Sequence, residues 1–498
     1  MATDLAMGQP VEYALSSSVL AVHLAAAAGQ SEDELRNVYY HALLRYIGCN
    51  AETDAMAAVV GDEIALRTEF AKIDGANLAQ VLRLSLRFIR DANAGASALE
   101  LLRAIARGLI ELGALQAEIF PGHCEVAQRL GERLGFAAEF VRGLGQLYAR
   151  WDGKGVPRLK GEAIAPSVRL VALAQDMVTF HRLGGIDAAV AVARQRRGRQ
   201  YDPALVDLFL RAGPALLAGP AVGPRWDDVL DLEPGEKRRL SDAEFDSACL
   251  ALADFADIKS PWTLSHSKRV SEFAAQGAAR LGLDAALLRR AGLLHDVGRV
   301  GVSAGIWGKP AALSEGQWEK VRLHAYYTER VLSRSPALAA LARLASCAHE
   351  RLDGSGYFRA SSGAVIDRNA RVLAAADVYS ALTEARPHRG AYAPDAAASQ
   401  MRAMAASGAL DRDAVEALLA AAGHATDGTR NTRPASLSAR EAEVLGLLAR
   451  GNSNKAIARR LGVSPKTVDN QVQSIYAKAG VRTRAGATLF AMEHGLLP

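Results

Sequence analysis

The same short pattern occurs in both halves of this chain of 498 residues, and it limits the possible folds more than any other feature. Asp152-Gly-Lys-Gly155 is matched by Asp353-Gly-Ser-Gly356. Two further pairs of segments recur in the same order, residues 43–48 with 293–298 and residues 171–174 with 373–376. Matches that keep their order along a chain predict a duplicated domain.

The residue pattern predicts that both copies are helical. Long segments rich in Ala, Leu and Arg carry apolar residues at the helical spacing, and β-branched runs are few.

The four cysteines form no CxxC pair, which excludes a disulfide scaffold and fits a reducing compartment. Residues 13–31 carry no charge, but no basic region precedes them, so we expect a buried helix rather than a secretory signal. These features predict a cytoplasmic protein that does not enter a membrane.

Two breaks rich in Gly and Pro divide the chain. We therefore expect an all-α protein with two tandem helical domains and a small four-helix domain. The expected ranges are 1–218 for the first copy, 219–239 for a linker, 240–424 for the second copy, 425–434 for a second linker and 435–498 for the small domain.

The second copy contains a set of residues suited to metal binding. His295 and Asp296 are adjacent at the end of an apolar helix, and an imidazole beside a carboxylate suits a divalent transition metal. A single His-Asp pair is more often an ordinary helix end. Four further candidate ligands in the same copy favour a metal site over an ordinary helix end: His266, His324, His349 and Asp377.

These motifs resemble the HD-GYP subgroup of the HD phosphohydrolases. The resemblance includes His295-Asp296-Val-Gly298, His349-Glu350, Asp353-Gly-Ser-Gly-Tyr357 and Arg386-Pro-His-Arg389. It implies a metal-dependent phosphodiesterase acting on a cyclic dinucleotide such as cyclic di-GMP, with one or two divalent ions per chain, Fe or Mn being most suitable.

The resemblance also assigns roles to individual residues. His295 and Asp296 would be catalytic and, with Asp377, would hold the first metal ion, while Asp296 would bridge to a second. The remaining ligands would be His266, His324 and His349, and the substrate would be bound by Tyr357, Arg386 and Arg389.

Three positions depart from the family pattern. Ala348 stands where the family usually has a histidine, Phe358 replaces a proline and Arg299 replaces a lysine. Loss of one ligand at Ala348 favours a weakly loaded second site. Two alternatives therefore stay open: a catalytically inactive regulator that senses a nucleotide, and hydrolysis of a nucleoside monophosphate at a single-metal site.

The first copy lacks the ligand set. Arg45-Tyr46 stand in place of His295-Asp296, and Gln175 stands in place of Asp377. The equivalence of His123 is ambiguous from the sequence. This copy is expected to serve in dimerisation or scaffolding, with a sensory pocket around Arg45 as the alternative.

The last segment predicts a helix-turn-helix domain. Ser438 and Glu441 form a capping box, residues 454–461 form a second helix, and Ser464 caps a third helix over residues 465–479. Nine Lys/Arg oppose four Asp/Glu in residues 435–498, which accounts for the whole net charge of +5. Such a local excess of positive charge favours a polyanion partner.

This segment resembles the LuxR-type helix-turn-helix. The resemblance implies binding of double-stranded DNA, with the third helix in the major groove, and a homodimer that contacts itself through a helix at residues 485–495. The expected DNA contacts are Lys455, Arg459, Arg460, Lys466, Thr467, Asn470, Gln473 and Lys478.

Overall fold

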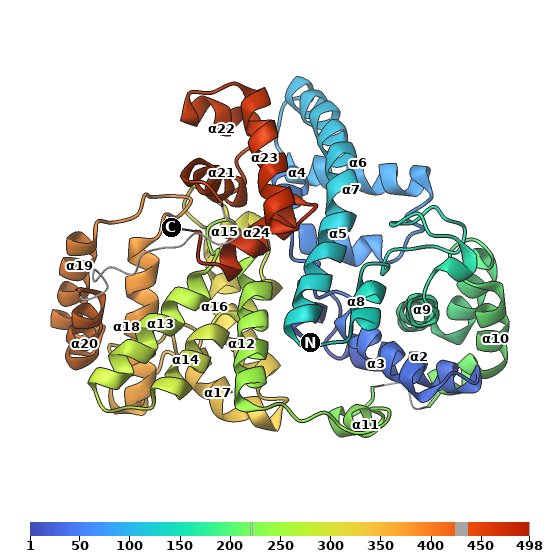
Figure 1. Ribbon diagram of the computed structural model, residues 1–498, viewed down its shortest axis with the longest axis horizontal. Helices are drawn as coiled ribbons and strands as arrows, with labels where there is room; N and C mark the ends of the chain where they lie inside the picture. Colours follow the sequence, from blue (N-terminus) through green and yellow to red (C-terminus); the bar gives the residue numbers. More distant parts are fainter. Residues whose placement is uncertain (220, 222, 424–436, 498) are drawn as a thin grey trace. The chain divides into compact units, whose positions relative to one another are not determined.

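The computed structural model describes residues 1–219, 221, 223–423 and 437–497, and the chain separates into two units at Glu244 and Phe245 (Figure 1). Within the described residues the regular structure is helical, and extended pairing is limited to isolated bridges such as Tyr148 with Val156. The all-α expectation is therefore confirmed. The second expected linker, residues 425–434, lies outside the described residues.

The first unit is built around a buried apolar cluster that α2, α3, α9 and α10 supply. Its helices are α1 (Ala2–Ala6), α2 (Tyr13–Ala27), α3 (Glu32–Leu44), α4 (Thr53–Val60), α5 (Glu63–Phe70), α6 (Leu78–Ala92), α7 (Ala98–Arg133), α8 (Ala138–Leu144), the 3-10 helix η1 (Gly161–Ala163), α9 (Pro166–Arg196), α10 (Pro203–Leu217) and α11 (Trp226–Asp231).

In the segment expected as the first linker, residues 219–239, the part from residue 223 onward packs against the first unit. It contains α11, whose Val229 is buried in the apolar cluster. The hydroxyl of Tyr39 donates to the carbonyl of Val229 at 3.1 Å, and Arg36 Nε donates to the carbonyl of Pro234 at 3.2 Å. The sequence did not indicate this packing because both partners lie far away along the chain.

The second unit repeats part of the helix order of the first, without counterparts of α5 and α6. Its helices are α12 (Asp242–Asp257), α13 (His266–Arg280), α14 (Ala285–Leu294), η2 (Val297–Gly301), α15 (Ala304–Trp307), α16 (Glu315–Leu332), α17 (Pro336–Ser346), η3 (Gly363–Val365), α18 (Arg368–Thr383), α19 (Pro394–Ala406) and α20 (Arg412–Gly423). The helix pairs α2/α13, α3/α14, α7/α16, α8/α17 and α9/α18 correspond, and η1 corresponds to η3.

Two close contacts fix the register between the copies. A Cβ on Gly48 would lie 1.9 Å from the carbonyl oxygen of His123, and a Cβ on Gly298 would lie 2.0 Å from that of His324. Only glycine permits this approach of two backbones. His123 is therefore the counterpart of His324, which resolves the ambiguity in the sequence.

The starts of helices α2 and α13 give a second correspondence between the two units. Helix α2 begins at Tyr13 after a residue with a left-handed backbone, and α13 begins at His266 in the same way. In each unit the carboxylate of an upstream aspartate accepts from the next backbone N–H, Asp4 from Ala14 and Asp257 from Ser267. Tyr13 thus occupies the position of His266.

The C-terminal domain has the four helices that the sequence predicts: α21 (Ala439–Ala449), α22 (Asn454–Leu461), α23 (Pro465–Ala479) and α24 (Arg484–Glu493). Ser438 and Glu441 form the capping box, and Ser464 accepts from the backbone N–H of Thr467. The apolar stripe of Val468, Val472 and Ile475 is buried against the other helices.

Candidate metal centre and DNA-binding surface

One aspartate side chain joins two groups of histidines in the second unit. Oδ2 of Asp296 lies 3.1 Å from Nε2 of His295 and 3.5 Å from Nε2 of His266. Its other oxygen, Oδ1, lies 3.1 Å from Nε2 of both His324 and His349. The carboxylate therefore has the arrangement of a ligand shared between two adjacent ions.

Asp377 approaches the same centre from α18. Its Oδ1 lies 3.3 Å from His266 Nε2, and its Oδ2 lies 3.1 Å from His349 Nδ1. All six of the expected ligands are thus brought together although they come from α13, the α14–η2 junction, α16, the segment after α17, and α18. We name this set the metal centre: His266, His295, Asp296, His324, His349 and Asp377.

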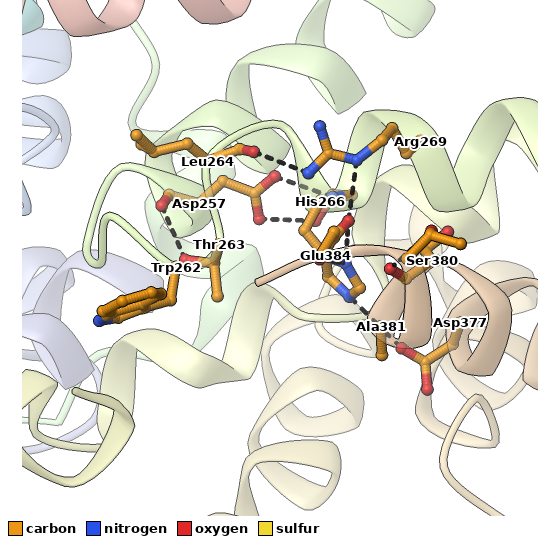
Figure 2. A network of polar contacts seen from close by, with 12 residues as sticks. Asp257, Trp262, Thr263, Leu264, His266, Arg269, Asp377, Ser380, Ala381 and Glu384 are labelled. Atoms are coloured by element: carbon orange, nitrogen blue, oxygen red, sulfur yellow. Dashed lines mark hydrogen bonds and ion pairs between the residues drawn. The ribbon is translucent and has the colours of Figure 1, made fainter. Parts of the chain in front are cut away.

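Hydrogen bonds at Nδ1 orient three of the rings. His295 Nδ1 faces the carbonyl of Gly292 at 2.8 Å, and His324 Nδ1 faces that of Val321. His266 Nδ1 lies 2.9 Å from Glu384 Oε2, and Figure 2 shows its ring between Glu384 and Asp377. When Nδ1 carries the proton, Nε2 presents a lone pair to the centre, which is the form that binds metals.

The unpaired polar atoms of the metal centre show whether its residues are suited to bind a metal ion. Nε2 of His266, Nε2 of His295 and Oδ2 of Asp296 are buried and make no well-formed hydrogen bond within the described residues, although they lie close to one another. Buried polar atoms rarely stay unpaired, because each such atom costs free energy. Imidazole nitrogens and carboxylate oxygens are also the donors that divalent transition metals prefer, so the residues fit a metal ion.

The charges of the centre favour a cation. Burial opposes the ionised form of Asp296, but Arg299 and His295 hold the pKa of its carboxyl well below the usual range. Burial opposes ionised Asp377 as well, and His349 and the other histidines lower its pKa. Burial and the neighbouring His349 lower the pKa of His324 to about 4, so this ring is neutral and free to bind a metal near neutral pH.

The sequence motifs did not identify Glu384 and assigned no role to Arg299, although both lie against the metal centre. Glu384 accepts from His266, from Arg269 Nε at 2.8 Å and from Arg386 Nη2 at 3.0 Å. Arg299 places Nε 2.8 Å from Oδ2 of Asp296, and its guanidinium carbon lies 4.8 Å from the centre of the Trp307 ring. No spacing in the sequence pointed to Glu384, because it follows α18 and meets His266 only through the fold.

The three residues expected to bind substrate have different surroundings. The Tyr357 ring stacks on His349 with centroids 4.9 Å apart, next to the metal centre. Arg386 is tied to Glu384 and to the carbonyl of Trp262. Arg389 donates to the carbonyls of Ala381, Leu382, Glu384 and Gly390, so its guanidinium holds the end of α18 and the loop that follows.

The residues expected to contact DNA lie on exposed positions of α22 and α23. The set is Lys455, Arg459, Arg460, Lys466, Thr467, Asn470, Gln473 and Lys478. Two of them make contacts within the domain. Lys478 Nζ lies 2.8 Å from both carboxylate oxygens of Glu441, and the Thr467 hydroxyl lies 2.8 Å from that of Ser464.

A helical unit in which two histidine groups share one aspartate, followed by a four-helix helix-turn-helix domain, defines the class of this protein: an HD-domain protein with a candidate metal centre and a LuxR-type DNA-binding domain. Residues 251–414 match the HD domain family, and residues 435–491 match the luxR family of bacterial regulatory proteins.

Comparison with known proteins narrows this class. The chain is 30% identical over 408 residues to the 3'3'-cGAMP-specific phosphodiesterase 3 of Vibrio cholerae, covering 80% of this chain and 88% of that protein. A crystal structure of a V. cholerae cyclic GMP-AMP-specific phosphodiesterase, V-cGAP3, matches 85% of this chain and 96% of its own, with a TM-score of 0.55 and 28% identity.

A third relative matches a shorter part. The cyclic di-GMP phosphodiesterase response regulator RpfG of Xanthomonas campestris is 32% identical over 157 residues, which cover 30% of this chain and 42% of that protein. The chain therefore belongs to the HD-GYP phosphodiesterase family.

Among the described helices, none combines the length and the apolar character that a membrane span requires.

Proposed function

We propose that the second unit hydrolyses a phosphodiester bond of a cyclic dinucleotide, and that the C-terminal domain places this activity at DNA. The observation that supports the enzymatic part is the shared carboxylate, with Oδ2 of Asp296 facing His266 and His295 and Oδ1 facing His324 and His349. The relatives named for cyclic GMP-AMP and cyclic di-GMP support the substrate class.

The metal centre would hold one or two divalent ions, and its mixture of imidazole and carboxylate suits Fe or Mn better than Mg. An ion bound there supplies Lewis-acid activation of water and neutralises charge on the phosphate. The chain's own residues orient and charge the site: the Nδ1 bonds of His266 and His295 direct their Nε2 atoms inward. Tyr357 and Arg386 lie at its edge and would contact the substrate.

A specific observation supports the regulator as the second candidate. Ala348 is fully buried directly before His349 and supplies no ligand atom where the family usually has a histidine. The second group consists of Asp296, His324 and His349, and without that further histidine it would hold its ion more weakly. In that case the domain would bind a nucleotide without turning it over.

The deciding experiment measures metal content by inductively coupled plasma mass spectrometry together with hydrolysis of 3'3'-cGAMP and cyclic di-GMP in the presence of Mn or Fe. We expect bound metal and turnover in the wild type, and reduced metal content with loss of turnover in His295→Ala and Asp296→Ala. His23→Ala is the matched control, because its ring bonds to the carbonyl of Val19 in its own helix and lies in the first unit. Bound nucleotide without turnover would favour the regulator.

We also propose that α22 and α23 bind double-stranded DNA as part of a homodimer, in the cytoplasm where the chromosome lies. The exposed cations Arg459, Arg460 and Lys466 support contact with phosphates, and exposed Asn470 and Gln473 support contact with bases. Light scattering of the full chain with and without an operator fragment tests the dimer, and a strictly monomeric complex would contradict it.

A further inference from the structure

The first unit keeps the geometry of a metal centre but replaces every ligand except one. Register between the copies places Tyr13 at the position of His266, Arg45 and Tyr46 at His295 and Asp296, and Gln175 at Asp377. The two remaining positions hold His123 and Tyr148. We name this set the first-unit centre: Tyr13, Arg45, Tyr46, His123, Tyr148 and Gln175.

The loop that positions one of these residues is retained. A Cβ on Gly155 would lie 2.3 Å from the carbonyl oxygen of Tyr148, and a Cβ on Gly356 would lie 2.8 Å from that of His349. Both loops also carry the same backbone hydrogen bond: the N–H of Val156 donates to the carbonyl of Tyr148 at 3.0 Å, and the N–H of Tyr357 donates to that of His349 at 3.2 Å. The backbone of the site is thus preserved while its chemistry has changed.

The change reverses the charge of the site. Neither of the metal-centre carboxylates has a counterpart, and a guanidinium has been introduced at Arg45. Burial opposes its charge, but Tyr46, Asp176, Tyr148 and Tyr13 around it leave the pKa of Arg45 raised, so the group is cationic. The nearby carboxylate of Asp176 is already bonded to other groups, with Oδ2 accepting from Arg196 Nη1 at 3.2 Å and Gln200 Nε2 at 2.8 Å.

Polar atoms of this centre are buried without partners. Nε and Nη1 of Arg45, and both Nε2 and Oε1 of Gln175, have no hydrogen-bond partner within the described part of the chain. Two tyrosines of the centre are paired. The Tyr13 hydroxyl donates to the backbone carbonyl of Gln175 at 2.8 Å, and the Tyr148 hydroxyl lies 2.9 Å from Cys49 Sγ. In the metal centre the corresponding unpaired atoms are ligands for a cation, whereas here they are mainly donors.

We propose that the first-unit centre binds the phosphate group of a nucleotide, with Arg45 as its anchor and Gln175 as a second donor. A guanidinium presents several N–H groups in one plane and suits phosphate oxygens. Arg45, Tyr46 and Tyr148 are each half-buried. The Tyr46 ring lies 5.8 Å from the guanidinium carbon and offers a flat surface for the rest of the ligand.

This site acts without a metal, which separates it experimentally from the second unit. The test uses the full chain carrying His295→Ala, stripped of metal with a chelator, and titrates inorganic phosphate, GMP and cyclic di-GMP by calorimetry. We expect nucleotide binding that Arg45→Met weakens at least tenfold, with partial recovery in Arg45→Lys. Arg142→Met is the matched control, because Arg142 is an exposed cation of neighbouring α8.

The titration with inorganic phosphate shows whether the site recognises a nucleotide or only a phosphate group. Tighter binding of GMP or cyclic di-GMP than of phosphate indicates a nucleotide ligand, and equal affinities would overturn that part of the proposal. Absence of binding by all three probes, or equal binding by the wild type and Arg45→Met, would overturn the site itself.

Thermal unfolding separates binding from a structural role. An unpaired buried charge costs stability, so Arg45→Met should leave the melting temperature of the ligand-free chain unchanged or raised while abolishing its increase by ligand. A lowered melting temperature with unchanged ligand response would assign Arg45 a structural role and contradict the proposal. Tyr148→Phe, which removes one hydroxyl, provides a second variant whose ligand response should weaken.

Discussion

Nδ1 of His266 lies 2.9 Å from Oε2 of Glu384, and this contact decides which nitrogen of the ring faces the metal centre. The carboxylate stays ionised: burial opposes its charge, but His266 and the two arginines Arg386 and Arg269 lower the pKa of Glu384 to about 2. The proton of the ring is therefore held on Nδ1, and Nε2 points to Asp377 at 3.3 Å.

The first prediction tests that contact. Glu384→Gln keeps the shape of the side chain but removes the charge that makes His266 a stronger ligand, so metal affinity should fall by about 10- to 100-fold. Competition with a chromogenic chelator measures this change. Glu319→Gln is the control, because that glutamate forms an exposed pair with Arg322. Unchanged affinity in Glu384→Gln would show that His266 needs no such partner.

A second prediction separates the two histidine groups. His266→Ala should deplete the ion held with His295, whereas His324→Ala should deplete only the ion held with His349. Asp296→Asn should lower the occupancy of both, because its two oxygens face different groups. Metal analysis after dialysis against limiting Mn measures each occupancy. Equal losses in all three variants would instead indicate a single metal site.

The third prediction concerns DNA affinity. Arg459 is an exposed cation of α22, so Arg459→Ala should weaken binding to all sequences alike and reduce the salt slope of log K by about 1. Asn470→Ala should instead cost about 1–3 kcal/mol at its own base pair and relax the preference there. Anisotropy titrations on an operator and on single-base variants distinguish the two. Identical behaviour of both variants would remove Asn470 from the base-reading surface.

The fourth prediction concerns stability of the C-terminal domain. Hydrogen bonds from Lys478, from the backbone of Ser438 and from Ser474 lower the pKa of Glu441 from 4.5 to about 2. Since the folded pKa is depressed, the stabilisation is complete above pH 4.5 and is lost as the pH falls through about 2. Glu441→Gln should destabilise the domain by about 1–2 kcal/mol at pH 7.

Hydrogen exchange of peptides from residues 437–497 measures that loss. Glu443→Gln is the matched control, because Glu443 forms an exposed pair with Arg440, and such pairs contribute little. Lys478→Met should resemble Glu441→Gln in exchange. A Lys478→Met domain with full protection and weakened DNA binding would show that this lysine serves DNA rather than the fold.

Local signals made the C-terminal domain the most predictable part. The bounds expected for α22 and α23 agree with the structure, since Ser453 and Ser464 cap the helices through their own side chains and Gly462 supplies the left-handed turn. These effects act within a few residues. The exposed position of Lys478 was equally readable, but its pairing with Glu441 required α21 and α23 to pack together.

The sequence by itself determined that the protein is helical and indicated that a domain is duplicated, because these follow from periodicity and from repeated motifs. It also predicted six metal ligands in the second copy, through a family resemblance. Only the tertiary structure decided that Asp296 divides its oxygens between two histidine groups, that Glu384 orients His266, and that Arg45 keeps unpaired donors in the first-unit centre. Those relationships join residues that lie far apart in the chain. The physical reason is that packing decides which partners a side chain meets, and these partners decide which of its atoms faces the site.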